Sequence, residues 1–257
     1  MRPKERRLEI LALVNRLGLA TVEDLSEKLD VSRETVRRDL TALEAAGSIR
    51  KYHGGARALD NRSVPDDVES PFDQRMTHNM DGKRAIADAA SQLFQRGDTI
   101  FIDTGSTTLA VAESLSHIPS LLVITNSPKI AAIIAGNGSS KVFLIGGAYG
   151  VEPAESLGPL ALEQIAKFRA QHAILTVGAI DAAGVMNFDL QEAEVARAII
   201  DRVETVTVVA DHTKFGRRAV FDVAPLSRIS RIVTDSVPTR EISSAIEAAG
   251  ASLIIAK

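Results

Sequence analysis

The chain has 257 residues, of which 45% are hydrophobic and 25% charged, and this composition excludes a wholly disordered or collagen-like protein. It contains no Cys, which excludes disulfides, thiolate metal sites and a cysteine nucleophile. No apolar run reaches the roughly 18–20 residues of a membrane helix. The charged start, residues 1–7, leads into an amphipathic stretch rather than the apolar segment of a signal peptide. We therefore expect a cytoplasmic protein with no membrane partner.

The charge is distributed unevenly along the chain. The formal net charge is −3, but residues 1–59 carry a net +3 and residues 60–257 a net −6. A small basic head on a larger acidic body indicates two domains with two functions. The segment between them is rich in Pro, Asp and small polar residues, which is typical of a linker. We predict a first domain over 1–58, a linker over 59–80 and a second domain over 81–257.

The head shows three helical patterns. Apolar residues recur at a spacing of three within residues 5–17, at Leu8, Leu11, Val14 and Leu17. Thr21 is a suitable N-cap for a second helix, and Ser32 for a third over 33–46, which Gly47 ends. Two helices, a short turn and a third helix form a helix-turn-helix, whose last helix enters the DNA major groove.

The outer side of this third helix carries the residue types that read DNA. Arg can donate a bidentate pair to guanine, and Ser or Thr can reach a base edge or a phosphate. The candidate contacts are Ser32, Arg33, Glu34, Thr35, Arg37 and Arg38. The alternative is a solvated charged helix, in which Glu34 and Arg38 form an ordinary i,i+4 pair.

A β-hairpin signal follows directly. Residues 48–57 contain two short strand-like runs around a Gly-Gly turn. A hairpin in this position is a wing beside the recognition helix, and its glycine tip allows close approach to a duplex. The candidate contacts to backbone phosphates are Arg50, Lys51, His53, Gly54 and Arg57.

These motifs together resemble a known family. The run Val31–Leu40, with its Thr-Val-Arg-Arg-Asp-Leu core, and the later Tyr-His-Gly-Gly-Ala at 52–56 resemble the N-terminal signature of DeoR-type bacterial transcriptional regulators. The resemblance implies an N-terminal winged helix-turn-helix that binds double-stranded operator DNA. Such readers usually bind palindromic half-sites as dimers, so we expect a homodimer or a homotetramer.

The body alternates between strand-like and helical patterns. Short, near-continuously apolar runs occur at 99–103, 121–125, 141–145, 173–177, 205–210, 229–234 and 252–256. Helical patterns occur at 106–116, 128–135, 159–168, 190–203 and 240–249. Continuous apolar runs are typical of strands that are buried on both faces, and the alternation predicts a Rossmann-like, mostly parallel α/β domain.

Ligands of such sheets bind beyond the carboxyl ends of the strands. Glycines, hydroxyl residues and a few charged groups follow the predicted strands or begin the next helix. The resulting candidates are Asp103, Thr104, Gly105, Ser106, Thr107, Thr108, Asn126, Gly146, Gly147, Gly178, Asp181, Glu192 and Lys214. Residues 104–108 join a strand to a helix, and the free N–H groups of a helix N-terminus favour an anion such as phosphate. Lys214 adds a cation from another strand end.

Each of these candidates has a purely structural alternative. Ser106 could only cap its helix, and Lys214 could be a solvated loop lysine. Glu192 lies three residues after Asp189, so the two could form a capping box. Asp181 could be a turn residue, and Asn126 could satisfy loop backbone.

The body also resembles the DeoR-type sensor domain. Matching segments are 83–87, 103–108, 125–127, 146–147, 178–181, 192–195 and 210–216. The resemblance implies a fold similar to sugar-phosphate isomerases and a phosphorylated sugar or polyol as effector, with residues 104–108 and Lys214 near its phosphate. The loop after Gly147, which includes Tyr149, Glu152 and Pro153, matches no part of the family pattern.

We therefore predict a DNA-binding transcriptional regulator, a repressor of a sugar or polyol catabolic operon that is relieved by a phosphorylated metabolite, and not an enzyme. The rival function is an active sugar-phosphate isomerase or deaminase with an appended DNA-binding head. Acid–base groups for it are available at Asp103, Asp181, Glu192, Asp211 and His212, but no paired His–carboxylate arrangement is visible. No Gly-x-Gly-x-x-Gly follows a strand and no metal-ligand spacing occurs, so we expect neither cofactor nor metal.

Overall fold

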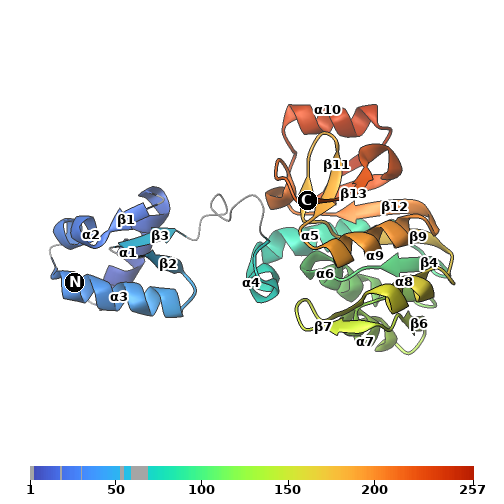
Figure 1. Ribbon diagram of the computed structural model, residues 1–257, viewed down its shortest axis with the longest axis horizontal. Helices are drawn as coiled ribbons and strands as arrows, with labels where there is room; N and C mark the ends of the chain where they lie inside the picture. Colours follow the sequence, from blue (N-terminus) through green and yellow to red (C-terminus); the bar gives the residue numbers. More distant parts are fainter. Residues whose placement is uncertain (1–2, 18, 30, 53–54, 59–68) are drawn as a thin grey trace. The chain divides into compact units, whose positions relative to one another are not determined.

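The computed structural model describes residues 3–17, 19–29, 31–52, 55–58 and 69–257. By its internal contacts the chain divides into two compact units, Met1–Pro65 and Asp66–Lys257. The helices and strands of each unit are drawn in Figure 1. The described residues form one hydrophobic cluster in the first unit and two in the second. The two units are therefore described one at a time.

The first unit combines helices with a three-stranded antiparallel sheet of order β1-β3-β2. Its elements are α1 (Pro3–Leu17), β1 (Leu19–Thr21), α2 (Val22–Leu29), α3 (Arg33–Ala45), β2 (Ile49–Tyr52) and β3 (Gly55–Ala58). The predicted helices and hairpin are present, and this is the winged helix-turn-helix arrangement. β1, which pairs with β3, has no counterpart in the prediction.

The core of this unit corrects one detail of the prediction. Ile10 and Val14 of α1 are fully buried, in one cluster with Val36 and Leu40 of α3. Leu8, which the spacing of three assigned to the buried face, is 62% exposed. An α-helix turns once in 3.6 residues, so a strict spacing of three drifts away from the buried face.

The second unit is built on a seven-stranded sheet of order β15-β14-β12-β9-β4-β5-β6, in which every neighbouring pair is parallel. The strands are β4 (Thr99–Ile102), β5 (Leu122–Thr125), β6 (Lys141–Leu144), β9 (Ala170–Leu175), β12 (Val203–Val209), β14 (Arg231–Thr234) and β15 (Ser252–Ile255). Each strand coincides with one of the seven apolar runs, so the predicted fold class is confirmed.

Helices cover both faces of this sheet. On one face lie α4 (Phe72–Thr77), α5 (Met80–Ser91), α6 (Ser106–Leu115) and α7 (Pro128–Ala135), and on the other α8 (Pro159–Ile165), α9 (Leu190–Ile200) and α10 (Arg240–Ala248). The two sets of helices contribute to two separate clusters of buried side chains, one on each face. Burial on both faces explains why the inner strands carry largely apolar runs, such as 173–175 of β9 and 206–209 of β12.

Short antiparallel strands are added to this frame. They are β7 (Ala148–Gly150), β8 (Glu155–Leu157), β10 (Ala179–Ile180), β11 (Gly184–Asn187) and β13 (Phe221–Pro225). β7 pairs with β8, and β11 pairs with both β10 and β13. The sequence did not predict these strands, because they have only two to five residues each and no clear alternation of apolar and polar positions.

The strand order reverses between β4 and β9. After β4 the chain builds outward through β5 and β6, and it then returns to place β9 on the other side of β4. Outside the carboxyl ends of two strands at such a reversal, the loops diverge and leave a crevice. The residues that follow β4 and β9 are therefore the first place to look for a ligand site.

The C-terminal part of the predicted linker is folded, which corrects the boundary at residue 80. Residues 59–68 lie outside the described part of the chain. Residues 72–77 form α4, and Phe72 is only 3% exposed, within the core cluster that includes α5 and α6. The helical pattern that begins at Phe72 and Arg75 in the sequence is present as two helices, α4 and α5, and the stability of the short α4 comes from tertiary packing.

Candidate functional site

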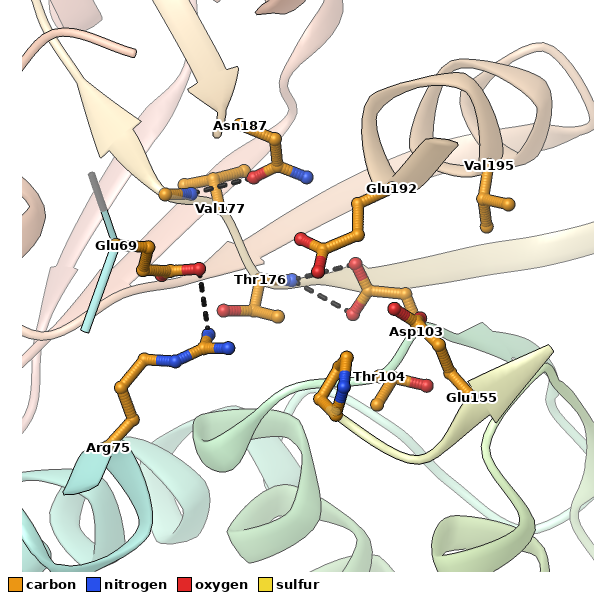
Figure 2. Close-up of a pocket in the computed structure, with 12 residues that line it drawn as sticks. Glu69, Arg75, Asp103, Thr104, Glu155, Thr176, Val177, Asn187, Glu192 and Val195 are labelled. Atoms are coloured by element: carbon orange, nitrogen blue, oxygen red, sulfur yellow. Dashed lines mark hydrogen bonds and ion pairs between the residues drawn. The ribbon is translucent and has the colours of Figure 1, made fainter. Parts of the chain in front are cut away.

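A pocket lies at the strand reversal and is lined by residues that follow β4 and β9 (Figure 2). Other lining residues come from the segment before α4, from α4 itself, from the β7–β8 hairpin, from the end of β11 and from the first half of α9. The full lining is Glu69, Arg75, Asp103, Thr104, Pro153, Glu155, Thr176, Val177, Gly178, Asn187, Glu192 and Val195. Most of these residues have polar side chains.

Three carboxyl groups share one side of the pocket (Figure 2). Asp103 accepts hydrogen bonds from the Thr176 N–H at 3.0 and 3.1 Å. Burial raises the pKa of Asp103 well above its usual range, although these hydrogen bonds oppose the shift. Burial and the charge of Glu192 raise the pKa of Glu155 to about 8. Burial and the charge of Glu69 raise the pKa of Glu192 to about 7. At neutral pH the Glu155 carboxyl is therefore mostly protonated.

Glu155 is fixed from behind by an amide. Asn126 Nδ2 donates to Glu155 Oε2 at 2.9 Å and to the Ser156 carbonyl at 3.2 Å, while Asn126 Oδ1 accepts from the Thr104 hydroxyl at 3.2 Å. Glu155 is 2% exposed, and its Oε1 has no partner among the described residues. A buried polar atom without a partner is costly, so this oxygen marks a place where a ligand can donate a hydrogen bond.

The opposite side of the pocket is cationic. Glu69 Oε2 forms an ion pair with Arg75 at 3.1 Å, and Glu69 Oε1 forms one with Lys214 Nζ at 2.6 Å. All three side chains are between 11% and 16% exposed. The Arg75 guanidinium lies over the Phe72 ring, 5.3 Å from its centroid, and the buried Arg75 Nε has no partner within the described part of the chain. An unpaired cationic donor favours an anionic ligand.

The corner between α4 and α5 positions Arg75. Lys83 of α5 donates to the carbonyls of Arg75 and His78. Burial lowers the pKa of Lys83. Asn79 Nδ2 donates to Asp235 Oδ2 at 2.7 Å, and Asp235 also accepts from the His212 N–H at 2.7 Å. This network connects the corner to η1 (His212–Lys214), the short 3₁₀ helix that carries Lys214.

The first turn of α6 lies directly behind Thr104. The N-cap of α6 is Gly105, and no side chain caps this end of the helix. Ser106 is the first helical residue, so the alternative that it serves only as the N-cap does not match the structure. The Thr108 hydroxyl donates to the Gly105 carbonyl at 3.1 Å. The first backbone N–H groups of α6 are therefore left without a side-chain acceptor, which favours an anion nearby.

Gly105 is required here because of space. Its φ of −179° is extended and open to any residue, but a Cβ atom would lie 2.1 Å from Thr176 Cγ2. We expect Gly105→Ala to push α6 away from the turn after β9 and to lower the free energy of unfolding by about 1–3 kcal/mol. Urea unfolding of the full chain measures this. Adding Thr176→Ser removes the clashing methyl group and should recover most of the loss; an unrecovered double variant would contradict the steric explanation.

The structure brings some of the predicted ligand residues into the pocket and leaves others outside it. Asp103, Thr104, Gly178 and Glu192 line the pocket. One contact away are Gly105, Asn126 and Lys214. Outside its lining lie Ser106, Thr107, Thr108, Gly146, Gly147 and Asp181.

Several of these residues have structural roles. Asp181 Oδ1 accepts from the N–H groups of Ala183 and Gly184 at 2.8 and 3.1 Å, which is a side-chain-stabilised turn. Asp189 caps α9 by accepting from the N–H groups of Gln191 and Glu192. The Glu192 side chain nevertheless lines the pocket, so capping does not account for it.

Sequence reasoning missed five lining residues that carry polar groups into the pocket. They are Glu69, Arg75, Glu155, Thr176 and Asn187. Glu69 and Arg75 fell within the predicted linker, and Glu155 lies just beyond the loop that matched no family pattern. The sequence does indicate a helical stretch that begins at Phe72 and Arg75, and α4 and α5 are present there, but nothing in that pattern predicts that Arg75 reaches the strand ends.

The predicted DNA-contacting residues form an exposed surface on α3. Ser32 caps this helix and accepts from the Thr35 N–H at 3.2 Å. The exposed Arg33 pairs with Glu23 at 3.0 Å, and the exposed Arg38 with Glu34 at 3.4 Å. The Glu34–Arg38 pair expected for a solvated helix is therefore present, and it leaves both side chains accessible to solvent.

The wing is described only in part. Lys51 is exposed, and its Nζ donates to the Thr41 hydroxyl at 2.8 Å. Arg50 and Arg57 are paired across β2 and β3, but the positions of their side chains are outside the described structure. The predicted contacts His53 and Gly54 lie outside the described residues altogether.

One charged residue of α3 has a clear structural role. Asp39, 2% exposed, accepts from Arg6 Nε at 2.6 Å and Arg7 Nε at 2.9 Å. Burial raises the pKa of Asp39, but the hydrogen bonds from the two arginines outweigh it and hold the pKa below its usual value. These bonds join α3 to α1, so Asp39 fixes the recognition helix rather than reading DNA.

Fold and surface together define a winged helix-turn-helix transcriptional regulator with a separate α/β domain. Two family models agree with this: the DeoR-like helix-turn-helix domain matches residues 6–62, and the DeoR C-terminal sensor domain matches residues 78–236. The chain belongs to the DeoR family of DNA-binding regulators.

Relatives of known name cover almost the whole chain. The HTH-type transcriptional repressor CsqR of Escherichia coli K12 is 33% identical over 97% of this chain and 94% of its own length. The glycerol-3-phosphate regulon repressor of the same organism is 33% identical over 93% of each chain. Among solved structures, ribose 5-phosphate isomerase from Plasmodium falciparum matches 52% of each chain with a TM-score of 0.38 and 15% identity. A match at that level does not bear on activity.

The described part of the chain has neither a membrane-spanning helix nor a cluster of metal-binding side chains. No helix within the described ranges is both long and apolar enough to cross a membrane. Across the same part of the chain, no group of three or more His, Asp or Glu side chains is placed to hold a metal ion.

Proposed function

We propose that this regulator is a repressor that leaves its operator when a phosphorylated sugar or polyol binds the pocket between β4 and β9. The observation that carries this proposal is the two-ended chemistry of the pocket. At one end are the cations Arg75 and Lys214, and at the other Asp103, Glu155 and Glu192. A phosphorylated polyol has the matching form, with a compact anion at one end and hydroxyl groups at the other.

The unpartnered atoms support the same orientation. Arg75 Nε can donate to a phosphate oxygen, and the uncapped first turn of α6 adds N–H donors behind Thr104. Glu155 Oε1 can accept from a hydroxyl group, and a protonated Glu155 or Glu192 can donate to one. Neutral carboxyls suit uncharged hydroxyls, because they accept and donate without repelling the phosphate at the other end.

The DNA-binding half of the proposal rests on the first unit. α3 enters the major groove, with Ser32, Arg33, Thr35, Arg37 and Arg38 toward the duplex, and the wing contacts the backbone. Repression through palindromic half-sites requires two copies, so we propose a homodimer or homotetramer in the cytoplasm, where a bacterial chromosome is reached. The DNA-binding domain, linker and sensor domain follow the two compact units, with the sensor domain beginning before α4 rather than at residue 81.

A second candidate function is favoured by one observation. The carboxyls of Glu155 and Glu192, with pKa values of about 8 and 7, suit general acid–base catalysis near neutral pH. We propose that the chain binds without turnover, because a sensor needs only a difference in affinity between its two states. Assays of aldose and ketose phosphate interconversion separate the two functions: turnover that Glu155→Gln abolishes would establish the enzyme.

The effector site is tested with Ser106→Glu and Lys214→Ala. Ser106→Glu places a carboxylate at the first turn of α6, where it repels an anion, and Lys214→Ala removes a cation from the other side. Both variants should show weaker release by sugar and polyol phosphates, since charge-assisted contacts are worth roughly 1.5–3 kcal/mol. Ser106→Glu, which leaves the Glu69 ion pairs in place, should also bind the operator like wild type. Operator titrations with and without a panel of these phosphates measure the response.

Lys141→Ala is the matched control. It removes one exposed lysine from the edge strand β6, away from the pocket, and should keep the full response. A full response in both Ser106→Glu and Lys214→Ala would show that the phosphate binds elsewhere.

A further inference from the structure

The anion-binding end of the pocket already contains an anion. The Glu69 carboxylate joins Arg75 and Lys214, with one oxygen on each cation at 3.1 and 2.6 Å. Arg75 comes from α4 and Lys214 from η1, so Glu69 is the group that bridges these two elements. Figure 2 shows the Glu69–Arg75 half of this bridge. A carboxylate that accepts from two cations at once is placed like two oxygens of a phosphate.

Little room remains beside this carboxylate. The cavity volume of the pocket is about 20 Å³. One ordered water needs roughly 10–15 Å³ by this measure. A phosphorylated sugar therefore does not fit while Glu69 and its neighbours keep these positions, and a group must leave before the ligand enters.

Glu69 is the lining residue that can leave with the least disruption. Asp103, Glu155 and Asn187 are each at most 7% exposed and are hydrogen-bonded to the backbone or side chains of strands and loops. Glu69 instead precedes α4, in a segment with no helix or strand, and its side-chain contacts are the two ion pairs. A phosphate that takes over both cations compensates for the loss of both contacts.

The position of Glu69 in the chain links the pocket to the DNA-binding unit. The first unit ends at Pro65, and the second begins at Asp66, shortly before Glu69. The ion pairs of Glu69 thus fasten the start of the second unit, where the connection from the DNA-binding unit arrives. Release of Glu69 detaches the described start of the second unit from Arg75 and Lys214.

We propose that Glu69 is a tethered anion that occupies the Arg75–Lys214 pair in the absence of effector, and that the effector's phosphate displaces it and so releases the segment that leads to the DNA-binding unit. The inference rests on the proposed function, since it assigns the regulation of the same pocket. It accounts for the small free space, for the two cations on one carboxylate and for the place of that carboxylate beside the unit boundary.

The test compares the affinity for inorganic phosphate of three full-length proteins: wild type, Glu69→Gln and Asp73→Asn. The affinity is measured from the rise of the thermal unfolding temperature with phosphate concentration. A tethered competitor lowers the apparent affinity by the fraction of time for which it fills the site. Glu69→Gln should therefore bind phosphate at least about tenfold more tightly than wild type. Asp73→Asn, which removes an exposed carboxylate of α4, should bind like wild type.

A second measurement uses only the wild-type protein, so it does not depend on how the Glu69 variant folds. Hydrogen exchange of peptides that cover residues 66–71 should become faster when phosphate is added, while peptides that cover 104–109 become slower. Phosphate binding that slows exchange at 104–109 but leaves 66–71 unchanged would overturn the tethered anion.

The outcomes separate the inference from the function on which it rests. Equal phosphate affinity in wild type and Glu69→Gln overturns the inference and leaves the proposed effector site standing. No phosphate binding by any of the three proteins, together with no operator release by sugar and polyol phosphates, overturns both.

Discussion

Replacing Arg37 and Arg38 together by alanine is expected to lower operator affinity about 30-fold or more. Both side chains are exposed on α3, the helix that a winged helix-turn-helix places in the major groove. A bidentate contact between Arg and guanine is worth about 1–3 kcal/mol, and each 1.4 kcal/mol is tenfold in affinity. Operator titration at one fixed salt concentration measures the loss. Specificity should relax at the base that either arginine contacts.

Two controls show what kind of contact is lost. Lys51→Ala removes a wing cation that we assign to a phosphate, so it should weaken all DNA sequences alike and reduce the salt slope by about one unit. Arg84→Ala removes an exposed arginine of α5 in the second unit and should leave operator binding unchanged. Wild-type operator affinity in the Arg37→Ala, Arg38→Ala double variant would remove α3 from the role of recognition helix.

The predicted frame of the second domain matched the structure because its strands lie inside the molecule. Both faces of β4, β9 and β12 are covered, so each of these strands contains a buried, largely apolar run that stands out in the sequence. The helices between the strands were predicted because each of them buries one apolar face, which gives a helical spacing of apolar residues in the sequence. The short antiparallel strands β8, β10 and β11 are buried along their length, but with two to four residues each they are too short to give a recognisable pattern in the sequence. β8, which carries Glu155, is one of them.

Apart from Glu192 at the start of α9, the pocket residues that were predicted are those that follow a strand of the sheet. Asp103, Thr104 and Gly178 follow β4 and β9, and the rule that ligands bind beyond strand ends identifies them. Glu69 and Arg75 reach the same place through a short helix before the sheet begins, and Glu155 through a hairpin. Such contacts depend on how far separate segments fold back, and no local pattern in the sequence encodes that distance.

Stability of the second domain is expected to fall as the pH rises, because burial raises the pKa values of both Glu155 and Asp103. The pKa of Glu155 is about 8 in the folded protein and 4.5 when it is free of its surroundings. Between these values the folded chain holds a proton that the unfolded chain has released. The free energy of unfolding therefore decreases with increasing pH in this window, by up to about 1.4 kcal/mol per pH unit for one such group.

Glu155→Gln removes this titration and keeps the shape of the side chain. A glutamine oxygen can still accept from Asn126 Nδ2, which now bonds Glu155 Oε2 at 2.9 Å. The variant should be about as stable as wild type near pH 5 and more stable than wild type at pH 8, by several kcal/mol if one full proton is involved. Urea unfolding of the full chain between pH 5 and 8 measures both slopes.

The same substitution at Glu163, an exposed residue of α8, is the control for the loss of a surface carboxylate. Its stability should follow the wild-type dependence on pH. Glu192, whose pKa is about 7, adds a second and smaller decrease over a lower range, so some slope should remain in Glu155→Gln. If wild type and Glu155→Gln lose stability in parallel from pH 5 to 8, the Glu155 carboxyl is ionised in the folded protein. Glu155 would then be a second anion in the pocket besides Glu69, and the hydroxyl-binding role assigned to this side of the pocket would have to be withdrawn.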